Sequence, residues 1–254
     1  MKNIVILGHG VGVKFVIESL IKSNSDYRVV ALVTHPKKEH EHDLNLMNRR
    51  KKYFGDYAYN VFNLESDHKI KILESKNVND IETINWIKTF SPTYLVSISC
   101  RDILKSRFLN EFKNMVLNIH NTPLPEYRGA ANDSWMILNN ELGKKIYGCL
   151  HFIDEGIDTG DIIEQETFKI TLKDNYKTLL EKAYINCPKL LIKAIDSIYH
   201  GNHIRIPQPL GAEHGIYCCR RIIGDEVLNW NQSSLNIFKK RASSFKSLLV
   251  EDMR

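Results

Sequence analysis

Two short segments of the chain combine side chains that can move a proton with residues that form turns. The first runs from Asn118 to His120 and leads into a Pro- and Gly-containing stretch, 123–129; the second, 151–161, ends in Asp158-Thr159-Gly160-Asp161. An amide, an imidazole and carboxylates beside Pro and Gly are typical of a polar site built at strand ends rather than of a packed core. We therefore interpret residues 118–158 as the candidate active site.

Asn118 and His120 are expected to share one face of a strand, because side chains two residues apart on a strand point the same way. A lone histidine near a strand end is more often structural, but the amide beside it and the turn after it favour a functional pair. The acidic residues at 154, 155, 158 and 161 could bind a hard cation, although calcium loops need a denser set of oxygen ligands. We favour a carboxylate that orients His120 and stabilises its charged form.

A glycine-rich loop, Gly8-His9-Gly10-Val11-Gly12, comes after the apolar run 3–7 and precedes a helical pattern. Glycines let the backbone approach a ligand, and the N–H groups at a helix start attract an anion. The dinucleotide fingerprint requires a further glycine at position 13, where Val13 stands. An anion site is the favoured interpretation; a plain strand-to-helix turn and a dinucleotide site are the alternatives.

Alternating apolar segments predict the elements that hold these residues. Strands are expected at 3–7, 29–34, 69–73, 94–99, 115–120, 147–153 and 162–163, and helices at 79–90, 131–142 and 174–200, with a last amphipathic helix from about 233. The run Val29–Val33 is apolar throughout, as in a strand covered on both faces of a parallel sheet. The prediction is an α/β fold: a Rossmann-like, mostly parallel twisted sheet with helices on both faces, plus a small C-terminal appendage.

The length and composition of the chain fit one main domain. The chain has 254 residues, 43% hydrophobic and 26% charged, which suggests neither disorder nor a membrane protein. No apolar run approaches the roughly 18 residues needed to span a bilayer, so a cytoplasmic location is expected. The five cysteines lack Cys-x-x-Cys spacing and are expected to be free thiols, and the formal charge of +5 suits an anionic small molecule as readily as nucleic acid.

Pro207-Gln208-Pro209 marks the expected boundary between a catalytic domain, 1–206, and a small extension, 207–254, which docks on the main domain or mediates dimerisation. The segment between the second and third strands is polar. Its histidines, His35, His40 and His42, could form a metal cluster, and its basic run 49–52 could contact a phosphate. A solvated loop or helix face is the favoured interpretation of both, and no metal is expected.

Several of these motifs together resemble the folate-dependent formyltransferase family. They are Asn118-Ile119-His120, Leu124-Pro125, Arg128-Gly129 and Asp158-Thr159-Gly160-Asp161, and the resemblance covers about residues 1–210. The stretch 151–160 looks most like enzymes that formylate an amino sugar attached to a nucleotide. The segment from Tyr217 to Arg221, followed by Asn229-Trp230, is similar to the one after the catalytic domain in nucleotide-sugar and methionyl-tRNA formyltransferases. Asn121-Thr122 and Cys100-Arg101-Asp102 depart from the family pattern.

The resemblance implies transfer of a formyl group from N10-formyltetrahydrofolate to a primary amine of a dTDP- or UDP-linked amino-deoxy sugar. His120 would take the proton or stabilise charge, the Asn118 amide would donate to the oxyanion, and Asp158 would orient His120. The residues it implies for folate binding are Ser99, Cys100, Arg101, Ile103, Ile153, Asp154 and Ile157. Those it implies for substrate binding are Gly10, Val11, Gly12, Arg128, Arg220 and Arg221. It also implies a homodimer without nucleic-acid or membrane partners.

Other interpretations stay open. Glycinamide ribonucleotide and methionyl-tRNA are rival amines; the tail argues mildly against the first, and the tRNA enzymes carry a further C-terminal domain, whereas this chain ends at Arg254. A dinucleotide-dependent oxidoreductase would leave 118–158 unexplained. A non-catalytic protein that kept the fold is the remaining alternative.

Overall fold

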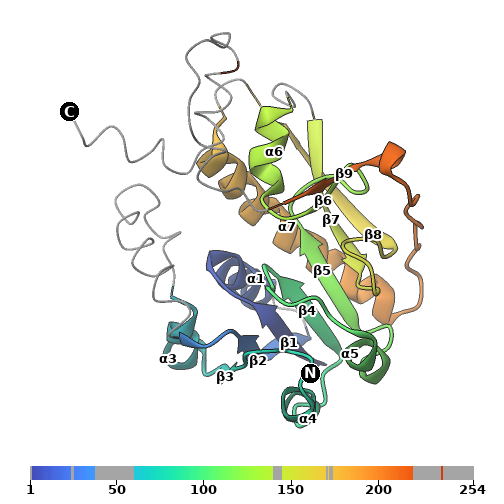
Figure 1. The fold of residues 1–254 in the computed structure, drawn as a ribbon. Helices are drawn as coiled ribbons and strands as arrows, with labels where there is room; N and C mark the ends of the chain where they lie inside the picture. The colour runs from blue at the N-terminus through green and yellow to red at the C-terminus, as the bar shows by residue number, and fades with distance from the viewer. Residues whose placement is uncertain are drawn as a thin grey trace, which may run out of the picture.

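The computed structural model describes residues 2–23, 26–37, 60–139, 145–169, 171, 174–219 and 236. Among them a seven-stranded sheet forms the centre of the molecule, in the order β3-β2-β1-β4-β5-β7-β8 (Figure 1). Its strands are β1 Lys2–Gly8, β2 Tyr27–Thr34, β3 Lys71–Glu74, β4 Tyr94–Ile98, β5 Val116–His120, β7 Lys145–Phe152 and β8 Ile162–Lys169. The first five in this order are parallel, whereas β7 and β8 are antiparallel to their neighbours. The expected α/β fold with a mostly parallel sheet is confirmed.

Helices cover both faces of the sheet because its central strands are apolar on both sides. In β1, Ile4 and Ile6 pack into the core that contains α1 (Val11–Lys22) and α7 (Tyr176–Tyr199), whereas Val5 and Leu7 pack into the core that contains α4 (Ile81–Lys88) and α5 (Ser106–Glu111). Alternation of side chains thus divides one continuous apolar run between two cores. The long helix α7 begins with a capping box formed by Asn175 and Thr178.

The remaining described helices are short. They are α3 Leu64–His68, α6 Asn132–Leu138 and the 3-10 segments η2 Val61–Asn63 and η3 Ala212–His214. Helix α3 ends where Lys69 adopts a left-handed conformation with φ of 57°, so β3 starts two residues later than the pattern at 69–73 predicts. Strand β8 extends well beyond the predicted 162–163, because it pairs with β7 as far as Lys169. No helix among the described residues is long and apolar enough to cross a membrane.

A second, two-stranded sheet joins distant parts of the chain and was not predicted. Strand β6 (Tyr127–Gly129) pairs in parallel with β9 (Ile216–Cys218), and flanking backbone hydrogen bonds link Ala130 to Cys218 and Ile216 to Glu126 (Figure 1). Gly129 has φ of +95°, and a Cβ there would collide with the Cys218 carbonyl. The segment after Pro207 therefore lies directly beside the candidate active site.

Several predicted features lie outside the described residues. They are His40, His42, the basic run 49–52, Arg220, Arg221 and Trp230, together with nearly all of the helix expected from 233.

Candidate active site

A cavity of about 740 Å³ opens at the carboxyl ends of β1, β4 and β5. Because β1 and β4 are neighbours although a long connection separates them in sequence, this is the edge where a doubly wound sheet binds ligands. The lining comes from His9, the 97–104 and 118–122 segments, residues 129–133, the loop after β7, helix α7 and β9. The cavity brings Asn118, His120 and Asp158 together, although Asp158 lies far from the other two in sequence.

The His120 ring is held from one side by structural contacts. Its Nε2 lies 2.7 Å from the Tyr127 carbonyl oxygen, 2.9 Å from Thr122 Oγ1 and 3.0 Å from Asn132 Nδ2. A carbonyl only accepts hydrogen bonds, so the short contact to Tyr127 places the ring hydrogen on Nε2 in the neutral side chain. The Nδ1 lone pair then faces the Asp158 side, with Oδ2 of Asp158 3.7 Å away. Nδ1 is thus the atom of His120 that is available to accept a proton.

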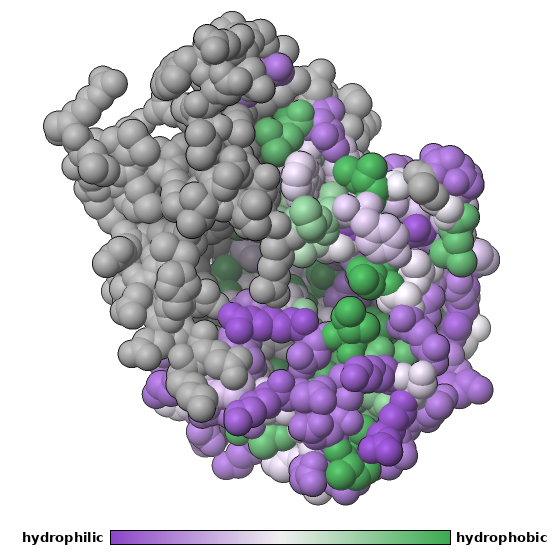
Figure 2. All heavy atoms as spheres, in the orientation of Figure 1, coloured by the Kyte–Doolittle hydropathy of each residue, from purple (hydrophilic) through white to green (hydrophobic). Residues whose placement is uncertain are grey.

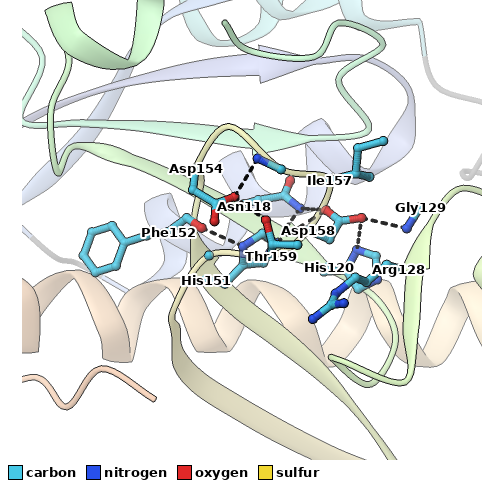
Figure 3. Close-up of polar contacts among 12 residues, drawn as sticks. Asn118, His120, Arg128, Gly129, His151, Phe152, Asp154, Ile157, Asp158 and Thr159 are labelled. Atoms are coloured by element: carbon cyan, nitrogen blue, oxygen red, sulfur yellow. Dashed lines mark hydrogen bonds and ion pairs between the residues drawn. The ribbon is translucent and has the colours of Figure 1, made fainter. Parts of the chain in front are cut away.

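Asp158 is fixed at the centre of the site by contacts to both of its oxygens (Figure 3). The Gly129 N–H donates to Oδ2 at 2.8 Å, Asn118 Nδ2 donates to Oδ1 at 3.3 Å, and His151 Nε2 lies 3.6 Å from Oδ1. Its backbone is in the left-handed region, with φ of 54°. Ser99 and Ala131, which also line the cavity, have φ of 55° and 56°. Three non-glycine residues with this sparsely populated conformation therefore gather around one cavity, as is common at functional sites.

Burial and neighbouring charges shift the pKa values of His120 and Asp158 in opposite directions. Burial lowers the pKa of His120, and the nearby Asp158 carboxylate offsets that effect only in part, so the imidazole is neutral near pH 7. Burial disfavours the charged form of Asp158, but His120, His151 and the Gly129 N–H outweigh it and hold the pKa of this carboxyl well below its usual range. A neutral base beside a permanent carboxylate can accept a proton and have the resulting charge stabilised.

His151 is a site residue to which the sequence reasoning gave no role. Its Nδ1 lies 2.7 Å from the Phe152 carbonyl oxygen, so Nδ1 carries the hydrogen and Nε2 accepts from Asn118 Nδ2 at 3.1 Å. Both amide hydrogens of Asn118 are then engaged, one by His151 and one by Asp158. To donate to an oxyanion, as the resemblance implies, Asn118 must release one of these contacts. The antiparallel register that pairs Asn118 with His151 is a tertiary feature that strand alternation alone does not reveal.

The predicted folate-binding residues come from two segments, 99–103 and 153–157, and the structure places them in the cavity lining. All seven line it: Ser99, Cys100, Arg101, Ile103, Ile153, Asp154 and Ile157. Asp154 also shapes its own loop, since its Oδ1 accepts from Thr159 Oγ1 at 2.6 Å and from the Gly156 N–H at 3.1 Å (Figure 3). Burial raises the pKa of the Cys100 thiol to about 11, so this side chain is not a thiolate near neutral pH.

Most of the predicted substrate-binding residues do not line the cavity among the described residues. Gly10, Val11 and Gly12 are outside the lining, which contains only His9 of the glycine-rich loop. Arg128 is 3% exposed and donates to Gln208 Oε1 at 3.3 Å and to the Pro209 carbonyl at 2.9 Å. These contacts bury Arg128 at the junction with residues 208–209.

Gln208 anchors the loop that carries Asp158. Its Nε2 donates to the carbonyl oxygens of Asp158 at 3.1 Å and Gly160 at 2.7 Å, and its own Oε1 accepts from Arg128. From the sequence, Pro207-Gln208-Pro209 indicated only a domain boundary. The signal that could have indicated docking is the amide side chain of Gln208, which can donate and accept hydrogen bonds and is held between two prolines. Within the described ranges no group of three or more His, Cys, Asp or Glu side chains could hold a metal ion.

Curated proteins share sequence with this chain. The chain is 33% identical over 170 residues to "Methionyl-tRNA formyltransferase" of Thermodesulfovibrio yellowstonii, covering 66% of this chain and 53% of that protein. It is 31% identical over 174 residues to "Bifunctional polymyxin resistance protein ArnA" of Wigglesworthia glossinidia brevipalpis, covering 67% of this chain and 26% of the other. The chain thus spans about half the length, or less, of these curated relatives.

Solved structures share the fold at lower identity. An N-formyltransferase of Helicobacter canadensis in complex with folinic acid and dTDP-3-aminofucose has a TM-score of 0.66 and 20% identity, covering 98% of this chain and 82% of that one. Phosphoribosylglycinamide formyltransferase of Bacillus halodurans has a TM-score of 0.57 and 22% identity, covering 76% and 94%. The family model described as formyl transferase matches residues 1–195. With its Asn118, His120 and Asp158 side chains meeting at the carboxyl edge of the sheet, the chain belongs to the formyl transferase family.

Proposed function

We propose that this protein transfers a formyl group from N10-formyltetrahydrofolate to the primary amine of a nucleotide-linked (dTDP or UDP) amino-deoxy sugar. The observation that carries this proposal is the convergence of His120, Asp158 and Asn118 on one cavity, with the Nδ1 lone pair of His120 on the Asp158 side. Acyl transfer to an amine needs this combination: a base for the amine proton, a charge to stabilise the protonated base, and polar groups for the developing oxyanion.

The donor side of the cavity fits a folate. Segments 99–104 and 153–158 offer backbone polar groups for the edge of a pterin, while the exposed side chains of Ile103 and Ile157 offer apolar surface for its rings. On the face shown in Figure 2, hydrophobic side chains lie among hydrophilic ones around a hollow. The folate supplies a formyl carbon that an amine can attack.

His120, Asp158 and Asn118 have different roles in the transfer. His120 Nδ1 takes the proton that the attacking amine loses, and the imidazolium is stabilised by Asp158, 3.7 Å away. When the tetrahedral intermediate collapses, the bond between the formyl carbon and N10 breaks, His120 returns the proton to N10, and tetrahydrofolate leaves. Asn118, held by His151 and Asp158, faces the reacting groups and can donate to the formyl oxygen when one of its two contacts is released. The hydrogen bond from the Nε2 hydrogen to the Tyr127 carbonyl oxygen holds the orientation of the ring, so the base is positioned before the substrate binds.

Two classes of acceptor have support. The stretch 151–160 resembles enzymes that formylate nucleotide-linked amino sugars, and solved structures that share the fold include "WlaRD, a sugar 3N-formyl transferase" and "a 4-N formyltransferase from Francisella tularensis". Methionyl-tRNA is the second candidate, because methionyl-tRNA formyltransferases of several bacteria are among the curated relatives of this chain.

One assay separates these candidates. Purified protein is incubated with N10-formyltetrahydrofolate and, in separate reactions, a panel of dTDP- and UDP-linked amino sugars, glycinamide ribonucleotide, and methionyl-tRNA, and each product is measured by mass for the added formyl group. We expect turnover of an amino-sugar nucleotide by the wild type and none by His120→Ala. Formylation of methionyl-tRNA alone would replace the sugar assignment, and no formylation of any acceptor would refute the proposed activity.

We also propose that residues 207–254 form a small extension that docks on the catalytic domain 1–206 and that the protein is a homodimer in a cytoplasmic setting. The contacts of Gln208 and β9 with the main body support the docking. Light scattering coupled to size-exclusion chromatography measures the mass of the assembly, and a monomer mass would contradict the dimer.

A further inference from the structure

Asp133 is a buried carboxyl side chain in the wall of the cavity that the catalytic scheme does not use. It lies in α6, is 7% exposed, and is next to Asn132, whose amide contacts the His120 ring. Within the described part of the chain, no other side chain hydrogen-bonds or ion-pairs with it. The groups that interact with it electrostatically, Tyr184 and Cys187 of α7, provide no positive charge.

This isolation is costly for the free protein. Burial raises the pKa of Asp133 to about 7, because the carboxylate gives up its hydration and gains in return only a hydrogen bond from its own backbone N–H, without a cation. Protein interiors normally pair buried carboxylates with other side chains, and a carboxylate in a cleft without such a partner is commonly explained by a ligand that completes the hydrogen bonding.

The position of Asp133 indicates which ligand it would meet. Tyr184 and Leu180 line the same cavity, and the start of α1 packs closely on Tyr184, since a Cβ at Gly12 would lie only 3.1 Å from that ring. Asp133 therefore belongs to the wall between the glycine-rich loop and His120. The residues assigned to the folate, at 99–104 and 153–158, come from other segments of the lining. The acceptor, which must reach His120 with its amine, is the ligand on the Asp133 side.

We propose that Asp133 forms a hydrogen bond with a hydroxyl group that neighbours the reacting amine on the acceptor sugar, and that it thereby determines which acceptors are used; this inference rests on the proposed function. A hydroxyl suits the site because it can donate to a carboxylate and can accept from a protonated carboxyl group. The reacting amine itself is needed beside His120 and Asn118. A site built to hold a hydroxyl discriminates strongly against an analogue that lacks it, because the buried carboxyl group is then left unpaired.

The test compares two variants with the natural acceptor and a set of its deoxy analogues. Asp133→Asn keeps the shape and removes the charge, and Asp133→Leu removes hydrogen bonding. The amino-sugar nucleotide turned over by the wild type is compared with analogues that lack, one at a time, the hydroxyls next to the amine. We expect Asp133→Leu to lower kcat/KM for the hydroxylated acceptor by about 10- to 100-fold. For one deoxy analogue, kcat/KM of Asp133→Leu should stay within about threefold of the wild-type value. The kcat/KM of Asp133→Asn for the hydroxylated acceptor should lie between those of Asp133→Leu and wild type.

Two further measurements distinguish binding from folding. Folinic acid affinity, measured by calorimetry, should match wild type in both variants, and the melting temperature of the ligand-free protein at pH 8 should not fall, since a buried carboxylate without a cationic partner contributes no net stability to the fold. The inference is overturned if the variants keep wild-type discrimination among the acceptors, or if all acceptors lose activity equally together with a lower melting temperature. If the wild type formylates no amino-sugar nucleotide, the proposed function fails and the inference fails with it, before any variant is compared.

Discussion

Replacing Asp158 with asparagine tests the electrostatic part of the mechanism with little change in shape. Asparagine tolerates the left-handed conformation that Asp158 adopts at φ of 54°, and its side-chain oxygen can still accept from the Gly129 N–H. The change therefore removes the negative charge beside His120 while it leaves the backbone unstrained.

The expected loss is set by the distance between the two groups. At an effective dielectric constant of about 20, opposite unit charges separated by the 3.7 Å between His120 Nδ1 and Asp158 Oδ2 attract by about 4 kcal/mol. The attraction is present only after His120 has taken the proton, so it stabilises the transition state and not the ground state. A loss of about 4 kcal/mol corresponds to roughly a thousandfold decrease in kcat.

Steady-state kinetics of Asp158→Asn, with the formylated product measured directly, give the decrease in kcat. We expect kcat to fall by roughly a thousandfold while the affinity for folinic acid stays near wild type. The matched control is Asp161→Asn, because Asp161 lies on the same loop, is outside the cavity lining, and has its carboxylate 3.9 Å from Arg205. A folded Asp158→Asn protein with kcat within about tenfold of wild type would refute the assignment of Asp158 as the partner of the base.

Other substitutions and changes of pH test the remaining parts of the structure. Asn118→Ala and His120→Ala should each lower kcat at least about a hundredfold without unfolding the protein, and near-normal turnover by either folded variant would contradict its role. The acidic limb of the kcat/KM profile should have its midpoint below about pH 6.5, because burial lowers the pKa of His120 and the base must be neutral; a midpoint above that value would contradict this. Stability should also fall as pH drops below about 6.5, since the unfolded chain then takes a proton that buried His120 resists; pH-dependent denaturant unfolding of wild type and His120→Ala measures this contribution, and equal slopes would argue against it. Gly129→Ala should destabilise the protein by about 1–3 kcal/mol more than Gly201→Ala, since both glycines have positive φ but only Gly129 abuts the Cys218 carbonyl; equal melting temperatures would contradict the close β6–β9 contact.

The fold was largely predictable because its strands carry local signals. The run Val29–Val33 is apolar throughout, which requires cover on both faces, and the structure places it in β2 between two parallel neighbours. Strand ends were less predictable where pairing decides them. Nothing between Glu164 and Lys169 reads as a buried run, yet these residues extend β8 because β7 provides a partner along their whole length. Strand β6 is three residues long and has no local pattern that distinguishes it from a turn.

For the site, the chemical groups were evident from the amino-acid sequence: an amide and an imidazole on one strand, a loop of carboxylates, and through resemblance the choice of Asp158 among them. The three-dimensional packing was needed to establish which atoms face one another. Antiparallel pairing of β5 with β7 puts His151 against Asn118, docking of Gln208 holds the loop of Asp158, and the Tyr127 carbonyl leaves Nδ1 of His120 as the base. Arg128 is a further example, since its type and its place in the sequence do not reveal that it is buried against Gln208. The physical reason is that side-chain type and strand alternation are local properties, whereas hydrogen-bond partners and desolvation depend on which distant segments pack together.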